Sequence, residues 1–178
     1  DFMISCTIPL ARSYLLQKNV ELKHKIEEVS KCTLYINKED IVIESVTKNA
    51  YNEYLCKNIL VAFGRGFSAD VACLRSEDEY YYSYINLGDY TASEKRIQQI
   101  KARVIGNQGK AKKYIEDFTS VKLSIYGDVI GIIGKLKGLA EAEVAIKALI
   151  LGETHKHAYA KMEACRRKND LETSSVKR

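Results

Sequence analysis

Proline is nearly absent from this sequence, which has one proline and ten glycines among its 178 residues. So few chain-breaking residues leave little room for flexible linkers. With 46% apolar residues, the composition excludes a disordered or fibrous protein. The chain is long enough to bury one ordinary hydrophobic core or two small ones.

Long apolar segments are also lacking. Apolar runs are short, as in residues 129–133 with a glycine inside, whereas a membrane-spanning helix needs about 20 apolar residues. Residues 1–16 do not combine a basic region with a sustained apolar one, so they do not resemble a secretory signal. We therefore expect a soluble protein without a membrane partner.

The sequence has little of what disulfides, metals or catalysis need. Its cysteines are odd in number, widely spaced and without a Cys-x-x-Cys pair, which predicts a reducing compartment, the cytoplasm. His155 and His157, near Cys165, would point about 200° apart on a helix, so we expect no metal site. No Gly-x-Ser-x-Gly elbow or Walker loop is present, and we predict neither catalytic activity nor a cofactor.

Charge is divided unequally between the two halves. Residues 1–90 contain 10 Lys/Arg and 13 Asp/Glu, and residues 91–178 contain 18 and 10, so the halves carry −3 and +8. This asymmetry indicates that a polyanion contacts the second half. An ordinary solvated basic surface is the alternative.

A shift of 89 positions superposes the sequence on itself. Apolar residues then coincide along most of the chain, as in the pairs Ile26 and Ile115, Leu34 and Leu123, Ile41 and Ile130, and Leu60 and Leu149. We interpret the chain as two copies of one unit.

Periodicity gives the element order of the second copy. A strand over residues 80–87 precedes a helix over residues 92–105, with Thr91 and Glu94 as its capping box. A second helix follows Gly109 with an apolar face of Ala111, Tyr114, Ile115 and Phe118. Alternation then predicts a strand over residues 121–126 with Ser124 on its outer face, a strand over 129–133 and a helix over 136–151 with Leu151 on its apolar face.

The first copy repeats this order. Strands are expected over residues 2–8, 33–37 and 41–46, and helices from Pro9, over 20–30 and over 50–63. Ser68 or Asp70 would begin a short connecting helix, and a last helix over 155–168 would project Arg166 and Arg167.

Gly106-Asn107-Gln108-Gly109 joins the first two helices of the second copy. A Gly-x-x-Gly turn lets a ligand approach the backbone and presents the amides of the next helix to phosphates. The following strands and helix make this the KH signature, whose loop clamps about four nucleotides. Bases would pack toward Ile105, Ile115 and the strand. The predicted RNA-binding residues are Lys101, Arg103, Ile105, Gly106, Asn107, Gln108, Gly109, Lys110, Lys112, Lys113, Lys122, Ser124, Arg166 and Arg167.

The equivalent loop of the first copy is Gln17-Lys18-Asn19-Val20, which has neither glycine. We predict that it has lost the ordinary RNA clamp. The first copy then serves either as a protein-docking surface or as structural support.

With these motifs placed, the chain resembles the archaeal-type Partner-of-Nob family. The resemblance rests on residues 64–68 (GRGFS), 85–90 (INLGDY), 100–106 (IKARVIG) and 125–134 (IYGDVIGIIG), and on the end of the chain, where Thr154 replaces an expected proline. It implies an α+β fold of two tandem type I KH domains, each a three-stranded sheet packed on helices, plus a C-terminal helix. The expected divisions are a degenerate KH domain over 1–75, a KH domain over 76–152 and a basic helix and tail over 153–178.

The resemblance also implies a function. The second domain would bind single-stranded small-subunit rRNA near its 3′ end in the pre-small-subunit ribosome. The implied partners are the Nob endonuclease and the alpha subunit of the initiator-tRNA delivery factor. Asn107-Gln108 is less basic than the middle pair common in KH loops. Two alternatives stay open: a protein adaptor that uses the degenerate first KH domain and binds RNA weakly, and a neighbouring KH family, the Krr-type assembly factors or the exosome caps.

Overall fold

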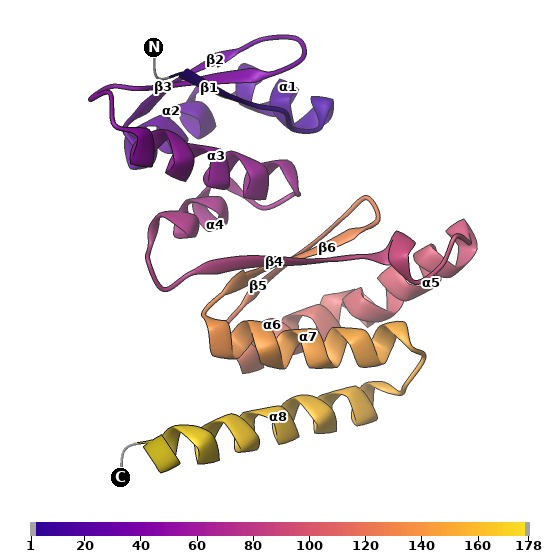
Figure 1. Ribbon diagram of the computed structural model, residues 1–178. Helices are drawn as coiled ribbons and strands as arrows, with labels where there is room; N and C mark the ends of the chain where they lie inside the picture. Colours follow the sequence, from indigo (N-terminus) through magenta and orange to yellow (C-terminus); the bar gives the residue numbers. More distant parts are fainter. Residues whose placement is uncertain (1–2, 177–178) are drawn as a thin grey trace. The chain divides into compact units, whose positions relative to one another are not determined.

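The computed structural model describes residues 3–176, which divide into two compact units between Tyr80 and Tyr81 (Figure 1). Each unit has a three-stranded antiparallel sheet with helices against it. This confirms the expected α+β class. No helix in the described part of the chain is both long and apolar enough to cross a membrane.

The first unit follows the predicted order of elements. It consists of β1 (Met3–Cys6), α1 (Leu10–Lys18), α2 (Val20–Ser30), β2 (Cys32–Ile36), β3 (Ile41–Ser45), α3 (Ala50–Gly64), α4 (Ala69–Cys73) and the 3-10 helix η1 (Leu74–Ser76). The strand order is β1-β3-β2, so the last strand lies in the centre. Asn19 begins α2 and Ser68 begins α4, because their side chains accept hydrogen bonds from the Leu22 and Val71 amides.

The second unit repeats this arrangement and ends in a much longer helix. It consists of β4 (Tyr81–Asn86), η2 (Leu87–Asp89), α5 (Glu94–Ile105), η3 (Asn107–Gly109), α6 (Lys110–Thr119), β5 (Lys122–Tyr126), β6 (Val129–Gly134), α7 (Leu136–Ile150) and α8 (His155–Val176). The strand order is β4-β6-β5, which places β5 at a sheet edge. In Figure 1, α8 runs along the outside of this unit beside α7.

The 89-residue repeat extends to individual hydrogen bonds. In the first unit the Glu27 carboxylate accepts a hydrogen bond from the Leu34 amide at 2.8 Å, and in the second Glu116 does the same for Leu123 at 3.2 Å. Each bond fixes the second helix of its unit to the strand that follows. The two copies are therefore equivalent in structure as well as in apolar pattern.

The repeat fails at the first strand of each unit. Ile41 lies opposite Cys6, 35 positions earlier, whereas Ile130 lies opposite Ile85, 45 positions earlier. The second unit thus has a longer connection between its first strand and first helix, and η2 lies in it.

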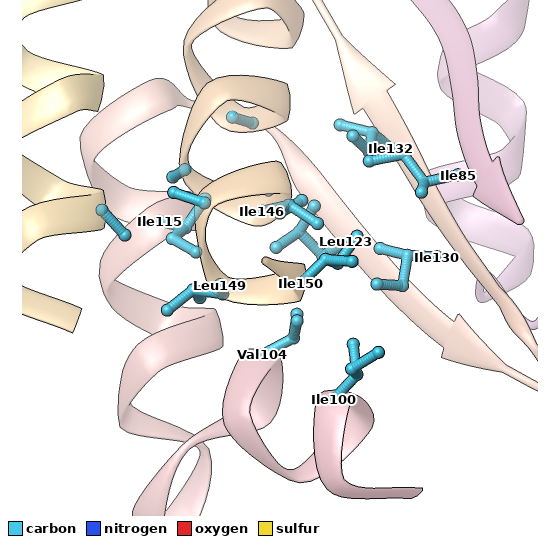
Figure 2. Packing of buried hydrophobic residues seen from close by; sticks show 14 of the residues in the cluster. Ile85, Ile100, Val104, Ile115, Leu123, Ile130, Ile132, Ile146, Leu149 and Ile150 are labelled. Atoms are coloured by element: carbon cyan, nitrogen blue, oxygen red, sulfur yellow. The ribbon is translucent and has the colours of Figure 1, made fainter. Parts of the chain in front are cut away.

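The core of the second unit joins its helices to one face of the sheet (Figure 2). Ile100 and Val104 of α5 and Ile115 of α6 are at most 1% exposed. They pack with residues of the sheet and α7, including Leu123, Ile130, Ile132, Ile146, Leu149 and Ile150. Each such side chain contributes about 1.5–3 kcal/mol by leaving water. This core fixes α5 and α6, and with them the loop between them.

Three local predictions were wrong. Helix α5 begins after Ser93, whose hydroxyl accepts from the Arg96 amide, and not with the Thr91 capping box. Helix α7 ends at Ile150, so Leu151 is 70% exposed rather than part of the apolar face. Helix α8 continues to Val176, eight residues beyond the expected end.

Candidate nucleic-acid interface

The loop between α5 and α6 depends on its two glycines for different reasons. Gly106 has φ +75°, and a Cβ there would lie 2.6 Å from the Ala111 Cβ and 2.7 Å from its amide nitrogen. Gly109 has φ +74°, but nothing lies within 4 Å of the place of its Cβ. Gly106 therefore permits close packing of the loop on α6, and Gly109 only permits a left-handed backbone.

Between the glycines, the loop backbone bends back on itself. Gln108 is in the left-handed region, with φ 53° and ψ 30°, and the Gly109 amide donates to the Gly106 carbonyl at 3.2 Å. Asn107 and Gln108 are exposed. Their side chains and the adjoining backbone are therefore accessible to a ligand that crosses the loop.

Helix α6 starts at the end of this loop without a side-chain cap. The Lys110 amide donates to the Asn107 carbonyl of the loop, and the helix dipole makes this end of α6 positive. A phosphate group over the loop would be attracted by this positive end. The N-terminus of α6 is thus suited to an anion, as the sequence predicts.

The lysines among the predicted RNA-binding residues differ in accessibility. Lys110, Lys113 and Lys122 are exposed, and Lys101 and Lys112 are partly buried. Lys112 lies 3.9 Å from the Glu116 carboxylate, one turn further along α6. Lys110 and Lys113, in the first turn of α6, are therefore the exposed cations nearest the loop, whereas Lys122 follows the other end of α6.

Apolar contact with bases is available at one of the predicted positions. Ile105, the last residue of α5, is 36% exposed beside the loop. Ile115 is fully buried in the core, so bases do not reach it. Ser124 was expected on an outer strand face but is only 8% exposed, because β5 buries side chains on both faces.

Arg103 and Arg166, both predicted RNA contacts, are held within the protein. The Arg103 guanidinium donates to the Leu149 carbonyl at 2.7 Å and to the Glu153 carbonyl. Arg166 makes three hydrogen bonds to the buried Glu141 carboxylate, and its guanidinium lies 3.8 Å from the Phe118 ring centre. The hydrogen bond to Glu141 raises the pKa of Arg166. Only Arg167 of this pair on α8 is exposed.

These partners were not recognisable from the sequence. They lie 25 to 50 residues away from their arginine, and an arginine that binds a carbonyl has the same local pattern as one that binds a phosphate. The histidines illustrate the same point. His155 bonds the Arg103 carbonyl, whereas His157 lies against the Glu153 carboxylate. Among residues 3–176, no group of three His, Cys, Asp or Glu side chains is arranged to hold a metal ion.

The first unit has no equivalent loop. Helix α1 ends at Lys18, and Asn19 alone separates it from α2, with φ −116° and ψ 98°. Val20 is 75% exposed at the start of α2. Neither the turn nor the uncapped helix start of the second unit is present here, as the missing glycines predict.

A hollow of about 560 Å³ nevertheless lies beside α1 in the first unit. Its lining includes Leu10, Tyr14 and Gln17 of α1 and Ile36 at the end of β2. Sequence reasoning missed this hollow. The signal was present in Leu10 and Tyr14, two large side chains one helical turn apart that are both exposed.

A family model for the second KH domain of PNO1 proteins, described as a eukaryotic type KH-domain (KH-domain type I), matches residues 81–167. A KH domain-containing protein of Methanocaldococcus jannaschii is 30% identical over 86% of this chain and 64% of its own length. RNA-binding protein PNO1 of Oryzias latipes is 26% identical over 88% of this chain and 60% of its own length. The chain thus spans less than two thirds of these relatives.

Solved structures agree in fold along nearly the whole chain. Dim2p from Pyrococcus horikoshii is 27% identical, with a TM-score of 0.81 over 92% of this chain and 99% of that one. A chain of the a/eIF2alpha–aDim2p–rRNA complex from the same organism is 28% identical, with a TM-score of 0.82 over 94% of both. A protein of Aeropyrum pernix, 20% identical with a TM-score of 0.87 over 98% of this chain and 95% of that one, supports the fold alone. The tandem KH fold expected from the sequence is confirmed.

Proposed function

We propose, from the premise that this chain belongs to the PNO1/Dim2p family of KH-domain proteins, that it binds single-stranded RNA and serves in small-subunit ribosome maturation. RNA would cross residues 106–109, with phosphates over the start of α6. The relatives are named for RNA binding and pre-rRNA processing, which supports the same role here. We assign no catalytic step to the chain itself.

The observation that supports RNA binding most directly is the geometry of the loop. Two glycines with positive φ shape an exposed turn, the N-terminus of α6 lies at its end, and Lys110 and Lys113 flank it. A duplex would present no unstacked bases to this turn, because bases in a helix are paired and stacked. The site therefore fits a single strand.

The finer assignment concerns the RNA and the partners. We propose that the bound segment is the 3′ region of small-subunit rRNA and that the protein assists the Nob endonuclease there, in the pre-small-subunit ribosome. The Pyrococcus horikoshii complex contains rRNA and a/eIF2alpha, which supports rRNA and the alpha subunit of the initiator-tRNA delivery factor as partners. Such a function would place the protein in the cytoplasm.

The test compares one RNA in two forms. Fluorescence anisotropy with the full chain should show tighter binding to the single-stranded 3′ segment of small-subunit rRNA than to the same segment paired with its complement. A scrambled single strand measures sequence preference. Equal or stronger affinity for the duplex would contradict the proposed site.

A protein adaptor with weak RNA binding is the second candidate function. The hollow beside α1, with Tyr14 and Leu10 exposed in it, favours this alternative because it offers an apolar surface in the more acidic half of the chain. This alternative would be supported if Tyr14→Ala abolished binding of the Nob endonuclease or the alpha subunit. It would also require that changes in the loop at residues 106–109 leave the RNA affinity unchanged.

A further inference from the structure

The end of α5 is bonded to a part of the chain about fifty residues later. The last carbonyls of a helix have no partner within it. In α5, the Gly106 amide donates to the Ala102 carbonyl at 2.8 Å, and the His155 ring nitrogen Nε2 lies 2.9 Å from the Arg103 carbonyl. Because a carbonyl only accepts, Nε2 must hold the proton of this bond. The first residue of α8 therefore caps α5 three residues before the loop.

The Arg103 side chain is bonded to the same region. Its guanidinium donates to the carbonyls of Leu149 and Glu153, which lie on either side of Gly152. Gly152 has φ +93° and turns the chain from α7 into α8. Arg103 is thus held at both its backbone and its side chain by this turn.

A second arginine of α5 adds to the connection. Arg96, two turns before Arg103, donates to the Ile150 carbonyl at 3.2 Å. The two guanidiniums satisfy carbonyls at the C-terminus of α7, where cations are also favoured by the helix dipole. Residues 149–155 consequently bond α5 along one side.

The loop has little freedom to absorb a shift of α5. Gly106 already packs so closely on Ala111 that a single Cβ would not fit. A small displacement of the end of α5 would therefore change how the loop amides point toward a ligand. Binding groups must be held within about 0.5 Å of their working geometry to be effective.

We infer that the turn between α7 and α8 positions the RNA-binding loop, and that Arg103 and His155 are positioning residues rather than RNA contacts. The inference rests on the proposed function and deepens it. The bonds at Arg103 and His155 connect the end of α5 to the end of α7 and to the turn and first residue of α8 that follow it. Helix α8 thus contributes to RNA binding indirectly, because its first residue, His155, bonds a carbonyl of α5 and holds that helix in place.

Three variants of the full chain test this. His155→Leu removes the donor at similar size, whereas His155→Gln keeps a nitrogen donor at the same number of bonds from the backbone. His157→Leu is the matched control, since His157 is exposed on the same helix and faces Glu153 instead of α5. Each variant is measured for RNA affinity at several salt concentrations, for hydrogen exchange of residues 105–109 without RNA, and for melting temperature.

His155→Leu should weaken binding about threefold to tenfold, the effect of one hydrogen bond, and should accelerate exchange in the loop. The slope of affinity against salt should stay unchanged, because no phosphate contact is removed. His155→Gln should restore both properties, and His157→Leu should change neither.

Parent-like affinity and exchange in His155→Leu would overturn the inference, and so would a reduced salt slope, which would make His155 a phosphate contact. If the parent itself does not bind RNA, the proposed function is wrong. The positioning of the loop is then still tested by hydrogen exchange: faster exchange in His155→Leu supports the positioning role, and unchanged exchange refutes that role.

Discussion

The two glycines of the loop at residues 106–109 are required for different reasons. Both have positive φ, but only Gly106 has a neighbour where a side chain would stand. A left-handed conformation costs a non-glycine residue about 1–2 kcal/mol, and a clash with backbone adds to this. The two positions therefore offer a matched pair of substitutions.

Gly109→Ala should lower the free energy of unfolding by about 1 kcal/mol, and Gly106→Ala by clearly more, because Ala111 and α6 must also move. Urea denaturation of the two full-length variants measures the difference. Equal losses would mean that the contact with Ala111 relaxes at no cost.

Asn107→Asp combined with Gln108→Asp should abolish RNA binding and leave the fold intact. Both side chains are exposed, and two carboxylates would face the phosphates. We expect affinity to fall at least about tenfold, since like-charge contacts at interfaces cost several kcal/mol. Anisotropy measures the affinity.

The control exchanges the two residues, Asn107→Gln with Gln108→Asn, which keeps the size and polarity of the loop without charge. Circular dichroism and melting temperature must match the parent in both variants. A folded aspartate variant that binds the RNA as tightly as the parent would show that RNA does not cross this loop.

At the scale of elements, α8 is attached to its unit by charge as well as by packing. The Glu141 side chain on α7 is fully buried, and Arg166 on α8 supplies its charged partner. Ala158 and Met162 add buried apolar contacts on the same helix. A basic residue near the end of the chain thus proves to hold α8 against α7.

Arg166→Leu should destabilise the second unit by about 3 kcal/mol, the lower end for a broken buried pair because Arg166 is itself partly exposed. The neighbouring Arg167→Leu should stay within about 0.5 kcal/mol of the parent, since Arg167 is exposed. Chemical denaturation compares the two. A small loss in Arg166→Leu would mean that Glu141 finds another partner.

At the scale of the molecule, two copies of one fold differ where RNA would bind. The first unit joins its helices through Asn19 alone, and the second inserts the loop at residues 106–109. The charge difference between the halves follows the same division. We therefore expect the second unit to bind RNA and the first unit to serve another role.

A fragment of residues 76–178 should keep the affinity for single-stranded RNA that depends on the loop, and residues 1–75 should bind the same RNA more weakly. Circular dichroism must first show that each fragment is folded. Tight binding by the first fragment would assign an RNA site to the hollow beside α1 instead.

The sequence alone determined the order of elements, the repeat and the place of the loop. These follow from periodicity and from glycine, which act over a few residues, so that α2 was predicted with its observed bounds, residues 20–30. The need for glycine at position 106 was equally local, since the positive φ belongs to the residue itself.

Only the tertiary structure decided which charged residues are available to RNA. Arg103 and Lys113 belong to the same basic stretch of sequence, yet Arg103 bonds carbonyls 46 and 50 residues away and Lys113 is exposed. Ser124 was misplaced for the same reason, because alternation along a strand does not reveal that both of its faces are covered. Long-range partners are chosen by packing, and packing has no local signature in the sequence.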